Sequence, residues 1–161
     1  MLSDQLESKR SAEITAAAIR YLSRRDYSRR ELHDRLRTKG FASELIEAAL
    51  NDLEEKGYQS DERFAETFLR SRISRGDGPF KIKMQLNQKG VAETLIEQLF
   101  NDSDINWLEQ AHRIRRKHFG DQLPTDNKSL SKQMRYLRNK GFYQDHIDAV
   151  VHSADGGTGA L

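Results

Sequence analysis

A glycine-centred pattern that occurs three times decides the fold of this chain. The copies read Leu36-x-x-Lys39-Gly40-Phe41-x-x-x-Leu45-Ile46-Glu47, Leu86-x-x-Lys89-Gly90-Val91-x-x-x-Leu95-Ile96-Glu97 and Leu137-x-x-Lys140-Gly141-Phe142-x-x-x-His146-Ile147-Asp148. Their glycines lie at positions 40, 90 and 141, so the spacing is nearly constant. Because a fixed period is typical of repeat architectures, the pattern predicts three tandem copies of one unit.

Apolar periodicity predicts three helices in each copy. In the first copy the apolar residues recur at helical spacing in three groups: Ile14, Ala17, Ala18 and Tyr21; Leu32 and Leu36; and Ile46, Ala49, Leu50 and Leu53. The other two copies repeat this order. Only three Val and two Pro occur in the chain, which favours helices over strands. We therefore expect an all-α fold of three tandem three-helix repeats that resemble helix-turn-helix units.

Polar and glycine residues mark the helix ends. Ser28 and Glu31 have the spacing of a capping box, and Gly40, Gly90 and Gly141 are placed to end the middle helices in a left-handed conformation. Ser60 or Asp61 is the expected N-cap of the next repeat. The segment Gly76-Asp77-Gly78-Pro79 predicts a turn with Pro79 in the first turn of a helix and a positive φ at Gly78.

These signals divide the chain into an N-terminal lead (1–11), three repeats (12–59, 60–103 and 104–152) and a mobile tail (153–161). A unit of about 45 residues is too small to bury much apolar surface alone. We therefore expect neighbouring repeats to stack, giving an elongated, curved molecule.

Composition excludes several classes of protein. Charged residues make up 32% of the chain, against about 25% in an average domain, yet the formal net charge is only +2. Without Cys there is no disulfide framework, thiolate nucleophile or Cys-ligated metal site. No stretch approaches the roughly 20 apolar residues of a membrane span, and residues 1–20 lack the apolar core of a signal peptide. We expect a cytoplasmic protein.

The sequence also lacks the motifs of common catalytic sites. There is no phosphate-binding Gly-x-x-x-x-Gly-Lys-Ser/Thr run, and the five His include no metal-binding pair at i,i+4. Most carboxylates lie at helix starts, where the helix dipole explains them. We expect no enzyme activity, no cofactor and no metal.

Charge alternates within each repeat. The first and second helices are basic, and the third helix and the residues after it are acidic, as at Glu44, Glu47, Glu54 and Glu55. Stacked repeats would present a basic ridge and an acidic ridge to a charged polymeric partner, but ordinary solvated helix faces with ion pairs explain the pattern equally well. Tyr27 lies between two arginine pairs, where it could stack on a base or a partner, or could be a structural turn aromatic.

Several segments resemble the bacterial RecX regulatory family. The residues that carry the resemblance are Tyr21-Leu22-Ser23-Arg24-Arg25-x-Tyr27-Ser28-x-x-Glu31-Leu32, Lys39-Gly40-Phe41, Gly57-Tyr58-x-x-Asp61-x-Arg63-Phe64-Ala65-x-x-Phe68-x-x-Ser71-Arg72, and Gly76-x-Gly78-Pro79-x-x-Ile82-x-x-x-Leu86-x-x-Lys89-Gly90-Val91. The similarity extends from about residue 12 to residue 151. Lys81 and Lys83 stand where the family often has arginine, which keeps the charge but loses the bidentate fork.

The resemblance implies a regulator that binds the RecA recombinase and its nucleoprotein filament, restrains filament growth, and inhibits ATP hydrolysis and strand exchange. It also implies three tandem three-helix repeats. We expect a monomer that touches the filament, and DNA phosphates weakly, through the basic side of repeats one and two. The expected contact residues are Arg24, Arg25, Tyr27, Arg29, Arg30, Arg70, Arg72, Lys81 and Lys83, supported by the structural motif residues Ser28, Glu31, Gly40, Asp61, Gly76, Gly78, Pro79, Gly90 and Gly141.

Two other functions remain open from the residues alone. The helix triplets and the arginine-rich first repeat would also suit a free-standing helix-turn-helix DNA-binding protein. A purely structural adaptor between proteins is the other alternative.

Stacking predicts a measurable shape. Small-angle X-ray scattering should give a radius of gyration clearly above the roughly 15–16 Å of a compact chain of this length, because an extended row of repeats spreads the mass along one axis. A value near 15–16 Å would contradict the extended arrangement.

Overall fold

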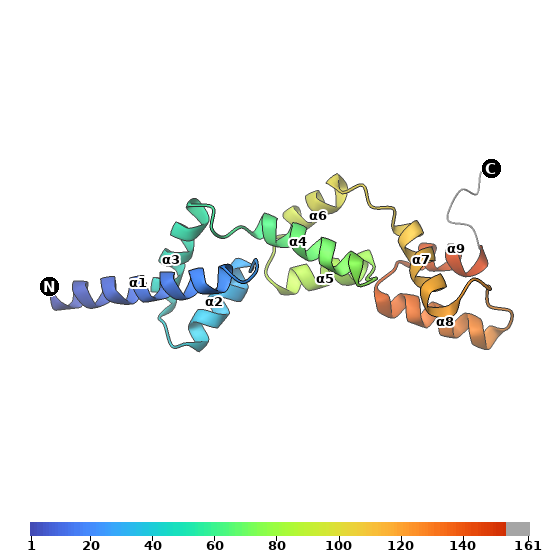
Figure 1. The fold of residues 1–161 in the computed structure, drawn as a ribbon, viewed down its shortest axis with the longest axis horizontal. Coiled ribbons are helices and arrows are strands. Elements are labelled where there is room, and N and C mark those ends of the chain that lie inside the picture. Colours follow the sequence, from blue (N-terminus) through green and yellow to red (C-terminus); the bar gives the residue numbers. More distant parts are fainter. Residues whose placement is uncertain (154–161) are drawn as a thin grey trace. The chain divides into compact units, whose positions relative to one another are not determined.

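The computed structural model describes residues 1–153, which are helical throughout apart from the connecting turns (Figure 1). Within that range there are nine helices and no strand: α1 (Leu2–Leu22), α2 (Arg29–Thr38), α3 (Ser43–Glu55), α4 (Asp61–Ser74), α5 (Pro79–Gln88), α6 (Glu93–Asp102), α7 (Trp107–Phe119), α8 (Asn127–Lys140) and α9 (Gln144–His152). This confirms the all-α class and the three helices expected in each repeat. The predicted mobile tail lies, except for Ser153, outside the described residues.

The periodic apolar residues form the cores of the first and third repeats. In the first repeat α1 and α2 both pack on α3, and Ile14, Leu32 and Ile46, one from each helix, are fully buried. In the third repeat α7 and α8 both pack on α9 around Ala111 and Leu137. Full burial of one Leu or Ile side chain contributes about 1.5–3 kcal/mol, so these buried residues stabilise the first and third repeats.

The expected helix ends are present in the structure. The Glu31 amide donates to Ser28 Oγ over 3.1 Å, and the Ser28 amide donates to Glu31 Oε1, which completes the predicted capping box of α2. Ser60, rather than Asp61, is the N-cap of α4, because Ser60 Oγ accepts from the Arg63 amide. Gly40, Gly90 and Gly141 all have the positive φ that ends the middle helices.

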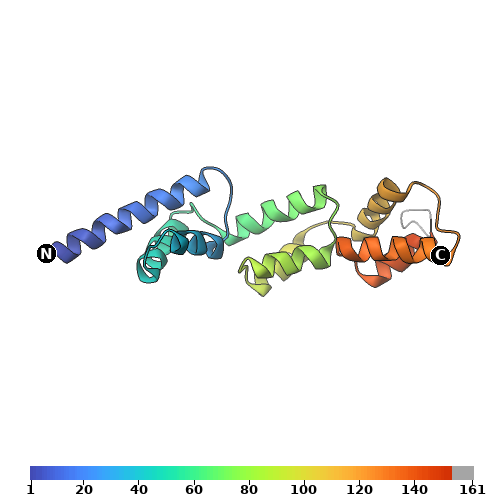
Figure 2. The ribbon, with the colours of Figure 1, turned by 90° about the horizontal axis from the view of Figure 1, so that it is seen from below.

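The first helix is longer than the sequence signals suggested. Residues 2–11, set apart as a lead, are continuous with α1, since nothing in this stretch interrupts a helix. The buried residues of α1 begin at Ile14, and the earlier turns extend beyond α2 and α3 in both Figure 1 and Figure 2. Among residues 1–153, no helix combines the length and apolarity needed to cross a bilayer.

The chain forms two compact units that divide the second repeat between them. Unit 1 comprises Met1–Phe68 and Leu86–Ile96, and unit 2 comprises Leu69–Gln85 and the described residues from Glu97 onward. The second helix of each repeat (α2, α5 or α8) is its middle helix. Each unit contains one junction, at which the first turn of one middle helix meets the C-terminal end of the middle helix of the next repeat.

The first junction, in unit 1, joins the start of α2 to the end of α5. Ser28 Oγ, which is fully buried, donates to the Lys89 carbonyl over 2.8 Å, and Lys89 Nζ lies 3.2 Å from Glu31 Oε2. The Arg29 amide donates to Asp61 Oδ1 over 2.8 Å. A side chain at Gly90 would begin 2.7 Å from the β-carbon of Arg30, so glycine permits this approach.

The second junction, in unit 2, joins the start of α5 to the end of α8. The Gly78 amide donates to the Lys140 carbonyl over 2.7 Å, and the Phe80 amide donates to the Gly141 carbonyl over 2.9 Å. Pro79 begins α5 as predicted. The expectation of a positive φ at Gly78 is wrong: Gly76 adopts it (φ 91°), while a β-carbon at Gly78 would lie 2.5 Å from the Gly141 backbone. Glycine is therefore required at position 78 because another backbone segment approaches closely, and not because the residue adopts a left-handed conformation.

This distinction predicts different substitution patterns at two glycines. Gly78→Ala and Gly78→Asn should both lower the free energy of unfolding by about 1–3 kcal/mol, because any β-carbon collides with fixed backbone. Gly57 has φ 79° and open space around it, so Gly57→Asn should cost less than Gly57→Ala. Urea unfolding of the four variants measures this. If Asn rescued Ala at position 78, close approach would not be the reason for the glycine.

Candidate functional site

The turn before α2 and the first turn of α2 together hold five of the predicted contact residues, and the structure separates them into internal and exposed groups. Tyr27 is only 6% exposed and belongs to the first-repeat core beside Tyr21, with ring centroids 5.7 Å apart. The Arg25 guanidinium lies 3.6 Å from the centroid of the Tyr27 ring and covers it. The burial of the Tyr27 ring favours the alternative of a structural turn aromatic, and a partner contact at Tyr27 stays a prediction.

Arg25 and Arg29 are held by carboxylates of the same repeat. Arg25 Nη2 lies 3.2 Å from Glu31 Oε2, and Arg29 bridges to α3 with contacts of 2.6 Å to Glu47 and 3.0 Å to Glu54. The predicted basic and acidic ridges are thus not separate here, because Arg29 joins them. Ion pairing, the simpler of the two explanations of the charge pattern, accounts for both arginines.

Glu31 is the central carboxylate of this turn. Partial burial acts to raise its pKa, but the hydrogen bond from Arg25 and the hydrogen bond from the Ser28 amide outweigh burial and hold the pKa below its usual value. Arg29 lowers the pKa of the exposed Glu47 through a hydrogen bond. Both carboxylates therefore stay ionised near neutral pH.

Arg24 and Arg30 differ from these two arginines. Both are exposed, and neither side chain makes a hydrogen bond or ion pair with any residue in the described part of the chain. The stem of Arg30 covers Gly90, which leaves its guanidinium to solvent. These two cations are the members of the predicted set in unit 1 that are available to a partner.

In unit 2 two of the predicted contact residues line a cationic cavity. Arg72 and Lys81 line a surface cavity of about 500 Å³ together with Arg75 and Lys140, and Gln85 completes its polar lining. One carboxylate is present: Asp77 is 4% exposed and lies 3.3 Å from Lys81 Nζ. Four cations against one carboxylate make the cavity suitable for a phosphate or carboxylate group.

Two members of this cavity, Arg75 and Lys140, were not predicted as contact residues. Lys140 belongs to the repeated Lys-Gly motif, whose spacing indicates a structural role only. Arg75 directly precedes the turn at Gly76. The second junction brings the two residues together. The sequence could have predicted them only if the Lys-Gly motif had been combined with the order in which the repeats dock.

An exposed aromatic pair occupies another face of α5. Phe80 is 56% exposed and Tyr143 37%, and their ring centroids lie 6.3 Å apart in an edge-to-face arrangement. Met84, one turn along α5, is 45% exposed, and Lys83 Nζ lies 4.9 Å from the centroid of the Phe100 ring. Arg70 is exposed on α4. Exposed aromatic residues beside cations are typical of interaction surfaces.

Comparison with known proteins places the chain in a family. Residues 16–53 match the first three-helix domain of RecX, residues 60–99 the second and residues 104–151 the third. "Regulatory protein RecX" of Halorhodospira halophila is 37% identical over 145 residues, which cover 90% of both chains. The protein of the same name from Legionella pneumophila is 40% identical over 134 residues, covering 83% of this chain and 89% of its own. This chain belongs to the RecX family.

A solved structure shows the same fold. The crystal structure of RecX from Lactobacillus salivarius superposes with a TM-score of 0.76 over 90% of this chain and 96% of its own, at 24% identity. At that identity the likeness establishes the fold alone. The curated relatives are named as regulatory proteins rather than as enzymes, and among residues 1–153 no cluster of three potential metal ligands occurs.

The low pKa of Glu31 predicts a pH-dependent contribution to folding. Glu31→Gln should lower the free energy of unfolding above pH 5 by about 1 kcal/mol, because the variant loses the charged partner of Arg25 and Lys89. The difference from the parent should shrink as the pH falls below about 4.5 through the lowered pKa, since the unfolded state then takes up its proton first. Urea unfolding between pH 3 and 7 measures it.

Glu55→Gln, at an exposed carboxylate in the last turn of α3, is the matched control. A Glu31→Gln difference that stayed constant across this pH range would contradict the ionised capping box.

Proposed function

We propose that this chain restrains the RecA recombinase by binding its nucleoprotein filament, limiting filament growth and inhibiting ATP hydrolysis and strand exchange. Membership of the RecX family over all three repeats is the observation that carries the proposal. The chain acts as a cytoplasmic monomer, without a cofactor and without catalytic activity of its own. Its boundaries follow the repeats at 12–59, 60–103 and 104–152.

The contact surface is formed by exposed and half-buried cations of repeats one and two. In unit 1 these are Arg24 and Arg30, which have no carboxylate partner in the described residues. In unit 2 they are Arg70 and Lys83 together with Arg72, Arg75 and Lys81, the three cations of repeat two that line the cationic cavity. Several weak contacts on a polymeric partner add through effective concentration, so a filament binds more tightly than a lone recombinase subunit.

A direct DNA contact is the second candidate function, and the cationic cavity favours it. The four cations that line this cavity can pair with the phosphates of DNA as well as with the carboxylates of a protein. Salt separates the two partners, because the logarithm of DNA affinity falls by about 0.7–0.9 per phosphate contact for each logarithm of salt concentration.

The DNA-dependent ATPase of the recombinase, titrated with this protein, tests the function. Inhibition at sub-equimolar protein supports the filament regulator. Inhibition only when the DNA is saturated supports a DNA-binding protein, and no effect supports an adaptor.

Charge reversal tests the surface. Arg24→Glu with Arg30→Glu should weaken inhibition about tenfold or more, because both side chains are exposed and face a partner rather than this chain. The melting temperature should change little, since exposed charges contribute little to folding. Lys9→Glu with Arg20→Glu is the matched control, with the same charge change on exposed residues of α1. If both double variants inhibited equally, the contact with the recombinase would not include Arg24 and Arg30.

A further inference from the structure

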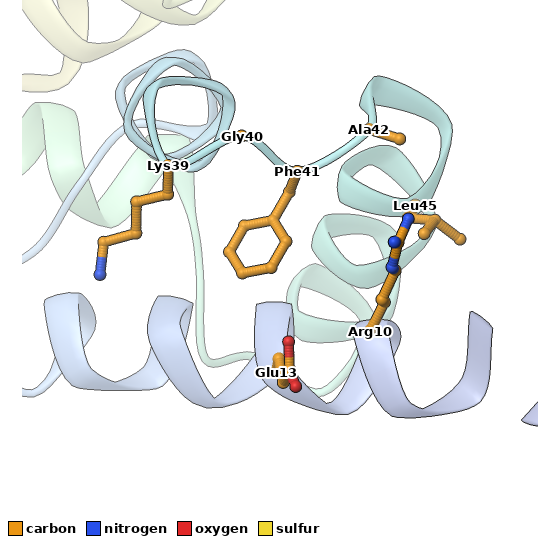
Figure 3. A pocket seen from close by; sticks show the side chains of 7 residues that line it. All are labelled: Arg10, Glu13, Lys39, Gly40, Phe41, Ala42 and Leu45. Carbon is orange, nitrogen blue, oxygen red and sulfur yellow. The ribbon is translucent and has the colours of Figure 1, made fainter. Parts of the chain in front are cut away.

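The Lys-Gly turn of the first repeat lines a pocket that no residue of the described chain fills. The pocket has a volume of about 230 Å³ and lies between α1 and the turn that follows α2. In Figure 3 the side chains of Lys39 and Phe41 point from the turn toward α1, where Arg10 and Glu13 lie. A β-carbon at Gly40 would meet nothing within 4 Å. We call this the first-repeat pocket.

The same position is filled in the second repeat. Advancing the pocket residues by fifty positions converts Glu13 to Arg63 and Lys39-Gly40 to Lys89-Gly90. The segment Asp26–Arg30 lies there: Asp26 Oδ1 is 3.1 Å from Arg63 Nε, and Ser28 Oγ donates to the Lys89 carbonyl. The first-repeat pocket is therefore the counterpart of a site that binds the first turn of a helix.

The corresponding position in the third repeat is also occupied by another segment of the chain. There the incoming segment is Gly76–Lys81: a β-carbon at Gly76 would meet Ile114 of α7, and the Gly78 amide donates to the Lys140 carbonyl. Both junctions share two features. A small residue at the N-cap, Ser28 or Gly78, supplies a hydrogen-bond donor to the lysine carbonyl, and the chain just after it covers the glycine.

In the first repeat the corresponding carbonyl and ammonium groups of Lys39 have no internal partner in the described chain. Within residues 1–153 no hydrogen-bond donor reaches the Lys39 carbonyl. Lys39 Nζ has no carboxylate partner there either and lies 5.2 Å from the centroid of the Tyr21 ring. Its counterpart Lys89 lies 3.2 Å from Glu31 in the filled site. With Arg10 and Lys39 against Glu13, the first-repeat pocket calls for a carboxylate on its occupant.

We propose that the first-repeat pocket binds the N-terminal turn of a helix in a partner protein, with a small donor residue at the N-cap and an acidic residue in the first turn. This inference rests on the two internal junctions and not on the proposed function. The N-cap group donates to the Lys39 carbonyl, and the acidic residue pairs with Lys39 as Glu31 pairs with Lys89.

A second copy of this chain fits the pocket less well. Its corresponding free helix start is that of α8, which carries no acidic residue in the first turn. The N-cap of α8 is Asp126, whose carboxylate already accepts from the Ser129 amide, so its side chain cannot donate as the Ser28 hydroxyl does. Lys128 would add a third cation beside Arg10 and Lys39. Charge complementarity therefore favours a different protein with an acidic first turn.

The test uses a synthetic helix as the probe. An acetylated, Ala-rich peptide of about 16 residues, with Ser at the N-cap and Glu three positions later, is titrated into the isotope-labelled full chain and followed by backbone-amide NMR. Saturable shifts are expected at Arg10–Glu13 and Lys39–Ala42. A peptide with the Ser replaced by Val and the Glu by Lys should bind about tenfold or more weakly.

Two matched substitutions separate blocking from unfolding. Ala42 is exposed and lines the pocket, whereas Ala48 is exposed on α3 outside it. Ala42→Trp should fill the pocket and weaken peptide binding about tenfold or more, while Ala48→Trp should leave binding unchanged. Matching amide spectra away from residue 42 establish that the variant is folded.

Three results would overturn the proposal. The first is the absence of saturable shifts at the pocket residues, and the second is peptide binding that survives Ala42→Trp. The third is a set of shifts at Lys39–Ala42 and Asp126–Ser129 when the chain is concentrated alone, which would identify a second copy as the occupant. Because the probe contains no recombinase, failure of this test and failure of the proposed function are separate results.

Discussion

The free carbonyl groups at the C-terminal end of one middle helix accept hydrogen bonds from the first turn of the preceding repeat's middle helix. This contact orders the repeats: Ser28 binds the end of α5, and Gly78 binds the end of α8. In both, the positive end of one helix dipole faces the negative end of another, and orphan backbone groups find partners. Glycines at 78, 90 and 141 are required because the neighbouring segment approaches too closely for a β-carbon.

Local signals were sufficient to predict the elements of this fold. The apolar periodicity around Ile14, Leu32 and Ile46 depends on neighbours within one helix, and the Ser28 and Glu31 capping box depends on four consecutive residues. Both are visible in sequence because helix formation and capping are local. The error at Gly78 shows the limit of such signals, since a glycine that avoids a backbone 63 positions away looks the same as one with positive φ.

The candidate site was harder to predict because it depends on which charges find partners inside the chain. Arg24, Arg25, Arg29 and Arg30 look equivalent in sequence, yet folding pairs Arg25 with Glu31 and Arg29 with Glu47 and leaves the other two exposed. Burial of Tyr27 has the same origin, because its ring packs into the core that all three helices of the first repeat form. Contacts within the folded chain, which composition and spacing do not reveal, thus decide which of these residues are available to a partner.

The junctions also bear on how such a chain can change in evolution. Each Lys-Gly turn at a junction receives the start of one middle helix, and each middle helix offers its own Lys-Gly turn at the other end, so every internal repeat carries both halves of the same contact. Duplication or loss of a complete internal repeat would join compatible halves, whereas a break within a repeat would leave unmatched ends. Such chains can therefore gain or lose length in steps of one repeat, about fifty residues here, without inventing a new interface.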